Sequence, residues 1–465
     1  MILATLRLEC RIFFATPAGG LAFVLMLALS VCALVAGESQ HALDERARQA
    51  HARAVQGAFE AWRGALVRIE ATGIAKSPHE AQPMNLSVPV ALAPGPLPAF
   101  ALGLRELLPS QATLSPWNTS ATVFPAYQFQ NPTLLALGRF DLNFVTIVLL
   151  PLLMIAVSSD TLGRERARGT LRLLLAQGAR LESLAGWRLI LRNTWIVLPL
   201  MLASAAYAAS AAPVESWIFY LLWLAATGLY AGVWLGLIAL AVAWYRRTEA
   251  VAASLVAAWT AVVLVLPAVL AAAAEASYPA PSRLAYLSEL RAAQIDASRE
   301  VDRLTRGYLL DHPELTISDQ AAPSFHRDAY LANLEVERRT ASILAAFDRS
   351  RADRQSSLAR AQYASAALVA QRLLNRLAGA DEARYWRFQA GVRACLAHLA
   401  DAVGPSVVSG QRIRLAEVEG ATACAIDPPS LRELIVESRW PVFYLVSLAA
   451  VLLLFARRRL RRPPD

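Results

Sequence analysis

Six apolar segments constrain this chain more than any other feature of its sequence. They lie at about residues 18–36, 142–158, 193–212, 216–244, 250–274 and 440–456. Each is close to the roughly 20 residues that a helix needs to cross the hydrocarbon core of a bilayer. The 465 residues are 56% hydrophobic and only 17% charged, a composition that soluble globular proteins do not have. The sequence therefore predicts a mainly α-helical, polytopic membrane protein with six transmembrane helices.

Arginine marks one side of this predicted membrane domain. The loop at 159–192 contains seven arginines and three acidic residues, and the chain ends in ARRRLRRPPD. Arg7 and Arg11 precede the first span, and the short 245–249 loop contains two more arginines, whereas the 213–215 connection has none. Basic residues in short loops stay in the cytoplasm. Both termini and the two basic loops are therefore predicted to be cytoplasmic.

The same orientation explains the net charge of +9. Most of the basic excess lies in short segments next to the membrane, and the long segment at 275–439 has balanced arginine and acidic residues. A basic surface that faces the lipid bilayer needs no nucleic-acid partner. We expect none.

Two long segments are predicted to lie outside the membrane on the opposite side. The resulting organisation is an interfacial helix with the first span (1–36), a first extracytoplasmic insertion (37–141), spans two to five with the 159–192 loop (142–274), a second insertion (275–439), and the last span with a basic tail (440–465). Domains of this length cross the membrane regardless of their charge.

Both insertions have a largely helical composition. The segment after the first span lacks proline for about 35 residues and predicts an outward extension of that helix, whereas 78–133 is rich in proline and predicts an irregular, packed segment. In the second insertion, helices are predicted over 282–310, 325–378 and 381–403, arranged as an antiparallel bundle or hairpin. A short hairpin is predicted between 404 and 431.

Cys395 and Cys424 fall in the same extracytoplasmic segment. This compartment is oxidising in bacteria, so a disulfide between them is one prediction and two buried free thiols are the other.

The sequence contains no constellation of catalytic residues and no metal-ligand cluster, so neither an enzyme nor a cofactor or metal site is predicted. Lys76 is the only lysine, and it does not follow a glycine, which excludes a phosphate-binding Walker loop. The central parts of the spans have no carboxylate, histidine or arginine, which argues against an ion-coupled transporter.

Two patterns inside the spans have both a structural and a functional interpretation. Gly228, Gly232 and Gly236 form a small-residue stripe, which favours helix packing within the chain over a dimer interface. Trp223, Tyr230 and Trp234 are candidates for lining a translocation groove, although packing or lipid-facing roles are commoner for such residues.

The segment SSDTLGRERARGTLRLLLAQGARLESLAGWRLI, residues 158–190, resembles the hallmark of ABC-2-type transporter permeases. In that family an acidic residue closes the second span, and a glutamate precedes Gly-Thr-Leu and a leucine-rich turn. The matching residues are Asp160, Glu165, Gly169-Thr170-Leu171 and the leucines at 173–175, whereas Trp187-Arg188 replaces a lysine that is common in the family. The layout is similar to a bacterial branch with large insertions after the first span and before the last, whose substrates are unknown.

The resemblance implies a permease subunit of an ATP-binding-cassette export system in the bacterial inner membrane. A separate cytoplasmic ATPase would hydrolyse ATP, and a second permease copy or homologue would complete a dimer. The residues implied to contact the ATPase are Asp160, Glu165, Arg168, Gly169, Thr170, Leu171 and Leu174. Physical chemistry is consistent with this, because the helix dipole favours an acid near a helix start and leucines supply an apolar contact.

Two alternatives remain open at this stage. The loop would instead be a juxtamembrane helix lying among lipid headgroups. The protein would then be a membrane-anchored envelope assembly or sensor protein, whose helical outer domain binds a periplasmic partner.

Overall fold

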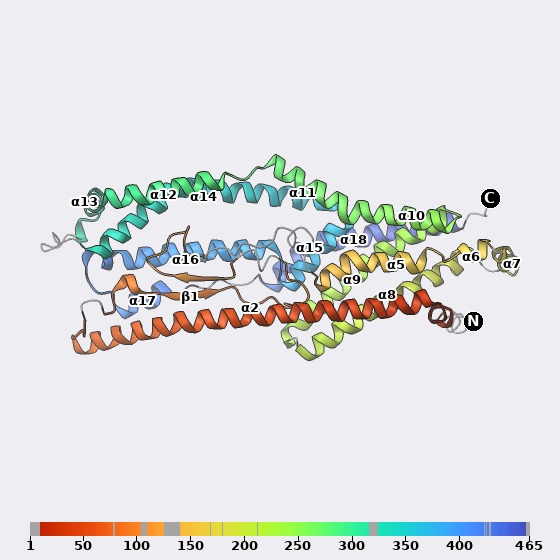
Figure 1. Ribbon diagram of the computed structural model, residues 1–465, viewed down its shortest axis with the longest axis horizontal. Helices are drawn as coiled ribbons and strands as arrows, with labels where there is room; N and C mark the ends of the chain where they lie inside the picture. Colours follow the sequence, from red (N-terminus) through yellow and green to blue (C-terminus); the bar gives the residue numbers. More distant parts are fainter. Residues whose placement is uncertain are drawn as a thin grey trace.

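One helix runs along most of the length of the molecule. In the computed structural model, α2 (Pro17–Thr72) has 56 residues, which corresponds to about 84 Å at 1.5 Å per residue. It contains the first apolar segment and continues, without a break, to the other end of the rod-shaped molecule (Figure 1). The half of the rod away from the two termini is its outer part, or outer domain. The described residues are 10–461, except for 78–79, 104–108, 125–139, 168, 179, 212, 316–323, 423, 425 and 427–428.

Five helical segments are long and apolar enough to cross a membrane, and they indicate a multi-pass membrane protein. Besides α2 they are α8 (Leu181–Ala211), the segment formed by η3 (Val214–Ser216) and α9 (Trp217–Trp244), the segment formed by α10 (Thr248–Trp259), η4 (Thr260–Val265) and α11 (Leu266–Ser277), and α18 (Leu431–Leu460). They gather at the end of the molecule where both termini lie (Figure 1). The prediction of a mainly helical membrane protein is thus confirmed.

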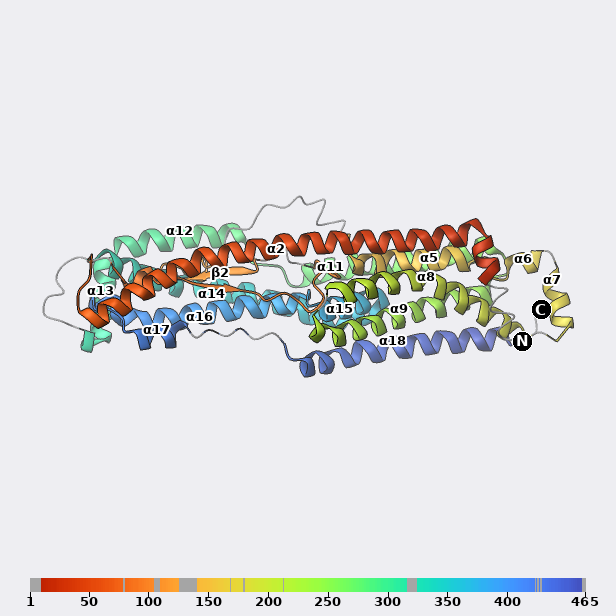
Figure 2. The same cartoon turned by 90° about the horizontal axis from the view of Figure 1, so that it is seen from below.

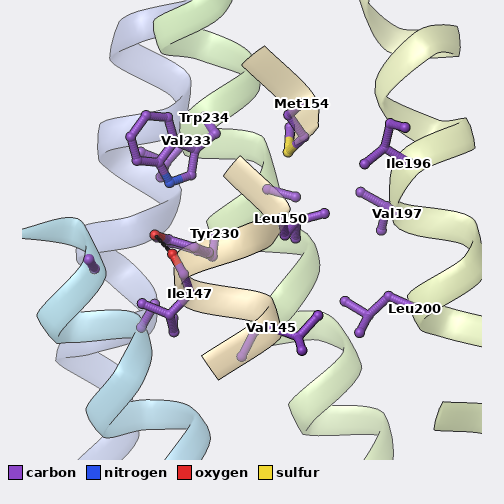
Figure 3. Close-up of a cluster of buried hydrophobic side chains, with 14 of the residues drawn as sticks. Val145, Ile147, Leu150, Met154, Ile196, Val197, Leu200, Tyr230, Val233 and Trp234 are labelled. Atoms are coloured by element: carbon purple, nitrogen blue, oxygen red, sulfur yellow. Dashed lines mark hydrogen bonds between the residues drawn. The ribbon is translucent and has the colours of Figure 1, made fainter. Parts of the chain in front are cut away.

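The second predicted span is shorter and less regular than the others. Residues 142–158 form α4 (Leu142–Phe144), a π-helical turn η2 (Val145–Leu149) and α5 (Leu150–Ser158). This segment packs against α8 and α9, where one face of it, including Val145, Ile147, Leu150 and Met154, is buried (Figure 3). It is an apolar helix of the central bundle, although it is shorter than the five helices above.

Two of the three stripe glycines, Gly232 and Gly236, pack within the chain, whereas a Cβ on Gly228 would meet no atom within 4 Å. A Cβ on Gly236 would lie 2.8 Å from the Cβ of Leu452 in α18, so only glycine permits this close approach of α9 and α18. Gly232 faces Ala449 of the same helix. This arrangement is the one that the sequence favoured.

Helices also dominate the outer part of the molecule. They are α12 (Arg283–Arg299), α13 (Val301–Asp311), η5 (Pro313–Leu315), α14 (Phe325–Ala361), α16 (Glu382–Ser409) and α17 (Leu415–Thr422). The proline-rich segment contributes η1 (Pro83–Asn85) and two antiparallel strands, β1 (Val88–Ala91) and β2 (Gln111–Leu114), with Val88 opposite Leu114. A second apolar core forms here, where the distal half of α2 packs with α14, α16, α17 and the strands.

The structure differs from three expectations in this region. The helix expected over 282–310 is divided at Glu300, and the one expected over 325–378 ends at Ala361. After η6 (Gln362–Ala364), α15 (Ala366–Ala378) starts with the Ser365 hydroxyl accepting a hydrogen bond from the Leu368 N–H. The apolar side of α15 joins the core of the membrane bundle. In place of the hairpin expected between 404 and 431, the chain forms α17.

Cys395 of α16 and Cys424, which lies between α17 and α18, are joined as a disulfide with their Cα atoms 5.8 Å apart. The bond links the outer core to the segment that leads back to the membrane.

Candidate functional site: the loop between α5 and α8

Two short helices project from the bundle in the loop after α5. They are α6 (Gly163–Ala167) and α7 (Thr170–Ala176). Figure 2 shows α7 beyond the ends of the apolar helices, at the extremity of the molecule where both termini lie. This loop contains the sequence hallmark, and its two helices differ in how they are held.

An ion pair fixes α6 to the bundle. Glu165 accepts a hydrogen bond from Arg188 of α8, with Nη1 and Oε1 2.5 Å apart, and only 22% of the Glu165 side chain is exposed. Arg188 also donates to the carbonyl of Thr161 over 3.4 Å. A charged pair with an additional hydrogen bond is more stabilising than an isolated surface pair. Glu165 therefore holds α6 against α8.

Arg166 attaches the same helix to α9. Its guanidinium donates to the carbonyl of Tyr245 at 2.7 Å and to that of Val242 at 3.2 Å. These carbonyls belong to the end of α9, where helical N–H donors are missing and a cation is favourable. Two neighbouring residues of α6 thus bind two different membrane helices.

Further hydrogen bonds join α5 to α8 just below the loop. Asn193 donates to the hydroxyl of Ser158 at 3.0 Å, and Arg192 donates to the carbonyl of Val157 at 3.2 Å. Both Asn193 and Ser158 are buried. The root of the loop is therefore fixed by polar contacts as well as by packing.

By contrast, α7 lies between two glycines with left-handed backbone. Gly169 has φ +74° and Gly178 has φ +85°, values that L-residues with a side chain rarely adopt. Leu171 is buried, whereas 65% of Leu173 is exposed and Arg172 is exposed too. Thus α7 exposes the apolar side chain of Leu173 to the surroundings, whereas α6 is anchored to the bundle.

The structure assigns different positions to the predicted contact residues. Asp160 lies in the turn before α6, Thr170 begins α7 and is exposed, and Leu174 is half-buried. Glu165 is paired with Arg188 of α8 and Leu171 is buried, although the resemblance implied that both would contact a partner. Arg168 lies outside the described residues. Sequence reasoning counted Leu173 and Arg188 among the motif positions but assigned no contact to them or to Arg166, because these roles depend on how the loop folds back on α8 and α9.

Three aromatic residues proposed to line a groove lie inside the bundle. Trp223, Tyr230 and Trp234 of α9 are at most 1% exposed, and Figure 3 shows Tyr230 and Trp234 among the apolar side chains of neighbouring helices. The Tyr230 hydroxyl donates to the carbonyl of Ile147 at 2.9 Å. In this single chain, the three side chains pack the protein interior.

A buried chain of hydrogen bonds connects the bundle to the outer part. Trp223 donates to the Asn143 side-chain oxygen at 3.0 Å, and the Asn143 amide donates to the Asn375 oxygen at 2.7 Å. Asn375 belongs to α15, and Asn143 begins the second apolar segment. The chain therefore links α9, α4 and α15, which all contribute to the core of the membrane bundle, and α15 leads on to α16 of the outer part.

No group of three or more histidine, cysteine, aspartate or glutamate side chains that could hold a metal ion occurs in the part of the chain that the structure describes.

Residues 283–422 match a family described as a domain of unknown function, DUF3526. The match begins at the start of α12 and ends at the end of α17, so it covers the outer helices and α15 but none of the five long apolar helices. No curated protein and no solved structure matches the chain.

Proposed function

We propose that this chain is the permease subunit of an ATP-binding-cassette export system in the bacterial inner membrane. It would have six spans, namely the five long apolar helical segments and the shorter 142–158 segment, which is the second along the chain. Both termini would be cytoplasmic. A separate ATPase subunit would hydrolyse ATP, and a second copy or a homologue would complete the transmembrane pathway. The substrate is not part of this proposal.

The observation that carries the proposal is the contrast between α6 and α7. A subunit without a nucleotide site has to receive force from another polypeptide through a rigid element. Here α6 is bound to α8 by Glu165 and to α9 by Arg166, and α7 presents Leu173 beyond the bundle. A displacement of α7 would therefore be transmitted to two membrane helices.

The polar chain at the other end of the bundle offers a continuation of this path. Movement of α9 would act on Trp223, and through Asn143 on Asn375 of α15. Because α15 is continuous with the outer domain through Gly379 and α16, the outer domain would respond to events at α7. Packed side chains and hydrogen-bonded networks of this kind are the physical means by which coupling travels between distant sites.

Co-purification with the ATPase tests the proposal. The neighbouring genes would first be searched for a Walker-motif ATPase, whose absence would count against the proposal. The chain would then be co-expressed with that ATPase and isolated in mild detergent. We expect the wild-type chain to retain the ATPase and Leu173→Glu to lose most of it, because a carboxylate replaces the exposed apolar contact. Leu310→Glu is the matched control, since Leu310 is 81% exposed on α13 in the outer domain.

Two results would count against a coupling role. One is the absence of ATPase from the wild-type complex, and the other is equal retention by Leu173→Glu and Leu310→Glu. Thermal unfolding of both variants shows whether either substitution has disturbed the fold.

The competing function is a membrane-anchored assembly or sensor protein. A cavity of about 600 Å³ between α16 and α17 favours this alternative, because it lies in the outer domain and its walls combine apolar residues with polar ones such as His398, Ser406 and Gln411. Recovery of an envelope protein in place of an ATPase in the same experiment would support it.

A further inference from the structure

A groove opens between α8 and α18 at the arginine-rich end of the bundle. Both helices pack on α9 but diverge from each other, and Ala239 of α9 lies at the bottom of the groove. The cavity has a volume of about 300 Å³. Its other lining residues belong to the start of α8 and the end of α18. These ends lie at the extremity of the molecule where α7 and both termini are found (Figure 2).

The walls of the groove are apolar. Trp187 and Ile190 of α8 are each 46% exposed, and Leu453 of α18 is 39% exposed. Gly186 leaves additional space, because a Cβ at this position would meet no atom within 4 Å. Tryptophan at the end of a membrane helix is typical of the headgroup level, where one side of the ring is apolar and the other is wet. These walls suit a hydrocarbon chain.

The mouth of the groove carries excess positive charge. Arg457 and Arg461 of α18 both bind Glu182 at the start of α8, with N–O distances of 3.1 and 2.6 Å. One carboxylate thus faces two guanidinium groups. Both arginines are more than half exposed, and Arg458 and Arg459 are exposed beside them.

We propose that this groove binds one anionic phospholipid. Its phosphate would bind Arg457 and Arg461, and one acyl chain would lie along Trp187, Ile190 and Leu453. The charge excess at the mouth and the hydrocarbon character of the walls select a lipid with a negative headgroup, because arginine binds phosphate through charged hydrogen bonds and basic pockets between membrane helices bind anionic headgroups. The site would brace α8 against α18, which contact each other only sparsely here. The inference does not depend on an ATPase partner.

Lipid titration of the full-length protein tests this site. The chain, purified in maltoside detergent, would be titrated with phosphatidylglycerol or phosphatidylcholine, and bound lipid would be counted by native mass spectrometry while thermal unfolding is followed. We expect phosphatidylglycerol to bind at least about tenfold more tightly than phosphatidylcholine and to raise the unfolding temperature. Inorganic phosphate alone should have neither effect, because it lacks the acyl chain.

Two variants, each with a matched control, test the headgroup site and the apolar groove separately. Arg457→Gln with Arg461→Gln should abolish the preference for phosphatidylglycerol, whereas Arg458→Gln with Arg459→Gln removes the same charge from the same helix turn and should retain it. Gly186→Leu leaves every arginine in place and fills the groove, so it should also weaken binding. Gly228→Leu, at another glycine with free space, is its control.

Several results would overturn the inference. They are equal binding of the two lipids, equal loss in the two arginine pairs, unchanged binding by Gly186→Leu, and stabilisation by phosphate alone. Because the substituted arginines are exposed and Gly186 has open space, we expect all four variants to fold. The unfolding temperature without added lipid measures this directly.

Discussion

At the scale of single residues, prolines in the long helices leave backbone carbonyls without an N–H donor, and side chains from other helices supply one. The carbonyls four residues before Pro151 and Pro441 accept hydrogen bonds in this way, from Tyr230 to Ile147 and from Arg376 to Glu437. A proline inside a helix removes one backbone hydrogen bond. The long-range contacts thus satisfy groups that the local sequence leaves unpaired.

Replacing Tyr230 by phenylalanine should reveal this compensation. Tyr230→Phe leaves the buried Ile147 carbonyl without its donor, and we expect a loss of about 1–2 kcal/mol in the free energy of unfolding. In a Pro151→Ala background, the restored N–H can satisfy the preceding turn, so the same substitution should cost less. Thermal unfolding in detergent measures both, and an equal loss in the two backgrounds would refute the explanation.

Glu335 gives the outer domain a defined response to acid. Its carboxylate binds Arg338 through two hydrogen bonds of 2.8 Å and Arg339 through one of 2.7 Å, and Arg339 also binds Asp296 of α12. The hydrogen bonds from Arg338 lower the pKa of Glu335 from 4.5 to about 2. Burial opposes this shift, and the hydrogen bond from Arg339 adds to it. A lowered carboxyl pKa stabilises the folded state above the unfolded pKa.

We therefore expect Glu335→Gln to be about 1–3 kcal/mol less stable than the wild type at pH 7. The difference should shrink as the pH falls from about 4.5 towards 2, because the wild-type carboxylate then becomes protonated. Unfolding temperatures of both proteins across this range would test it. A difference that stays constant with pH would show that Glu335 does not act through its charge.

At the scale of elements, the sequence predicts helices well and their breaks poorly. The extension of the first span into α2 is predictable because no proline interrupts 37–72. The break between α14 and α15 is not, since the residues there include neither glycine nor proline. Ser365 caps α15 and also donates to the Val262 carbonyl of η4, so tertiary contacts determine where the helix divides.

The disulfide should contribute measurably to the stability of the outer domain. Cys395 and Cys424 are 29 residues apart, and closing a loop of this length in the unfolded chain corresponds to about 3–4 kcal/mol in the chain-entropy model. Reduction, or Cys395→Ser with Cys424→Ser, should lower the unfolding temperature to a similar extent.

Thiol labelling provides the control for this prediction. Denatured but unreduced protein should react with a maleimide only at Cys10 and Cys32, which are free. Reaction at all four cysteines before reduction would show that the bond is absent from the protein as purified.

At the scale of the whole molecule, sequence patterns locate the candidate site but do not say which side chains face outward. The hallmark residues and the surrounding arginines identify the loop. Whether Glu165 meets a partner or Arg188 depends on the path of α6 over α8, which no local pattern encodes. The same is true of Leu171 and Leu173, since the buried contact that distinguishes them comes from tertiary packing.

The orientation of the rod relative to the membrane follows from its two differently charged ends and can be tested directly. With Cys10 and Cys32 replaced by serine, single cysteines at the exposed Arg172 and Arg412 report on opposite ends of the molecule. A membrane-impermeant maleimide applied to intact spheroplasts should label Arg412→Cys, and should label Arg172→Cys only after permeabilisation. The reverse pattern would place α7 outside the cell, beyond the reach of any cytoplasmic ATPase, and would remove the basis for a coupling role of the loop.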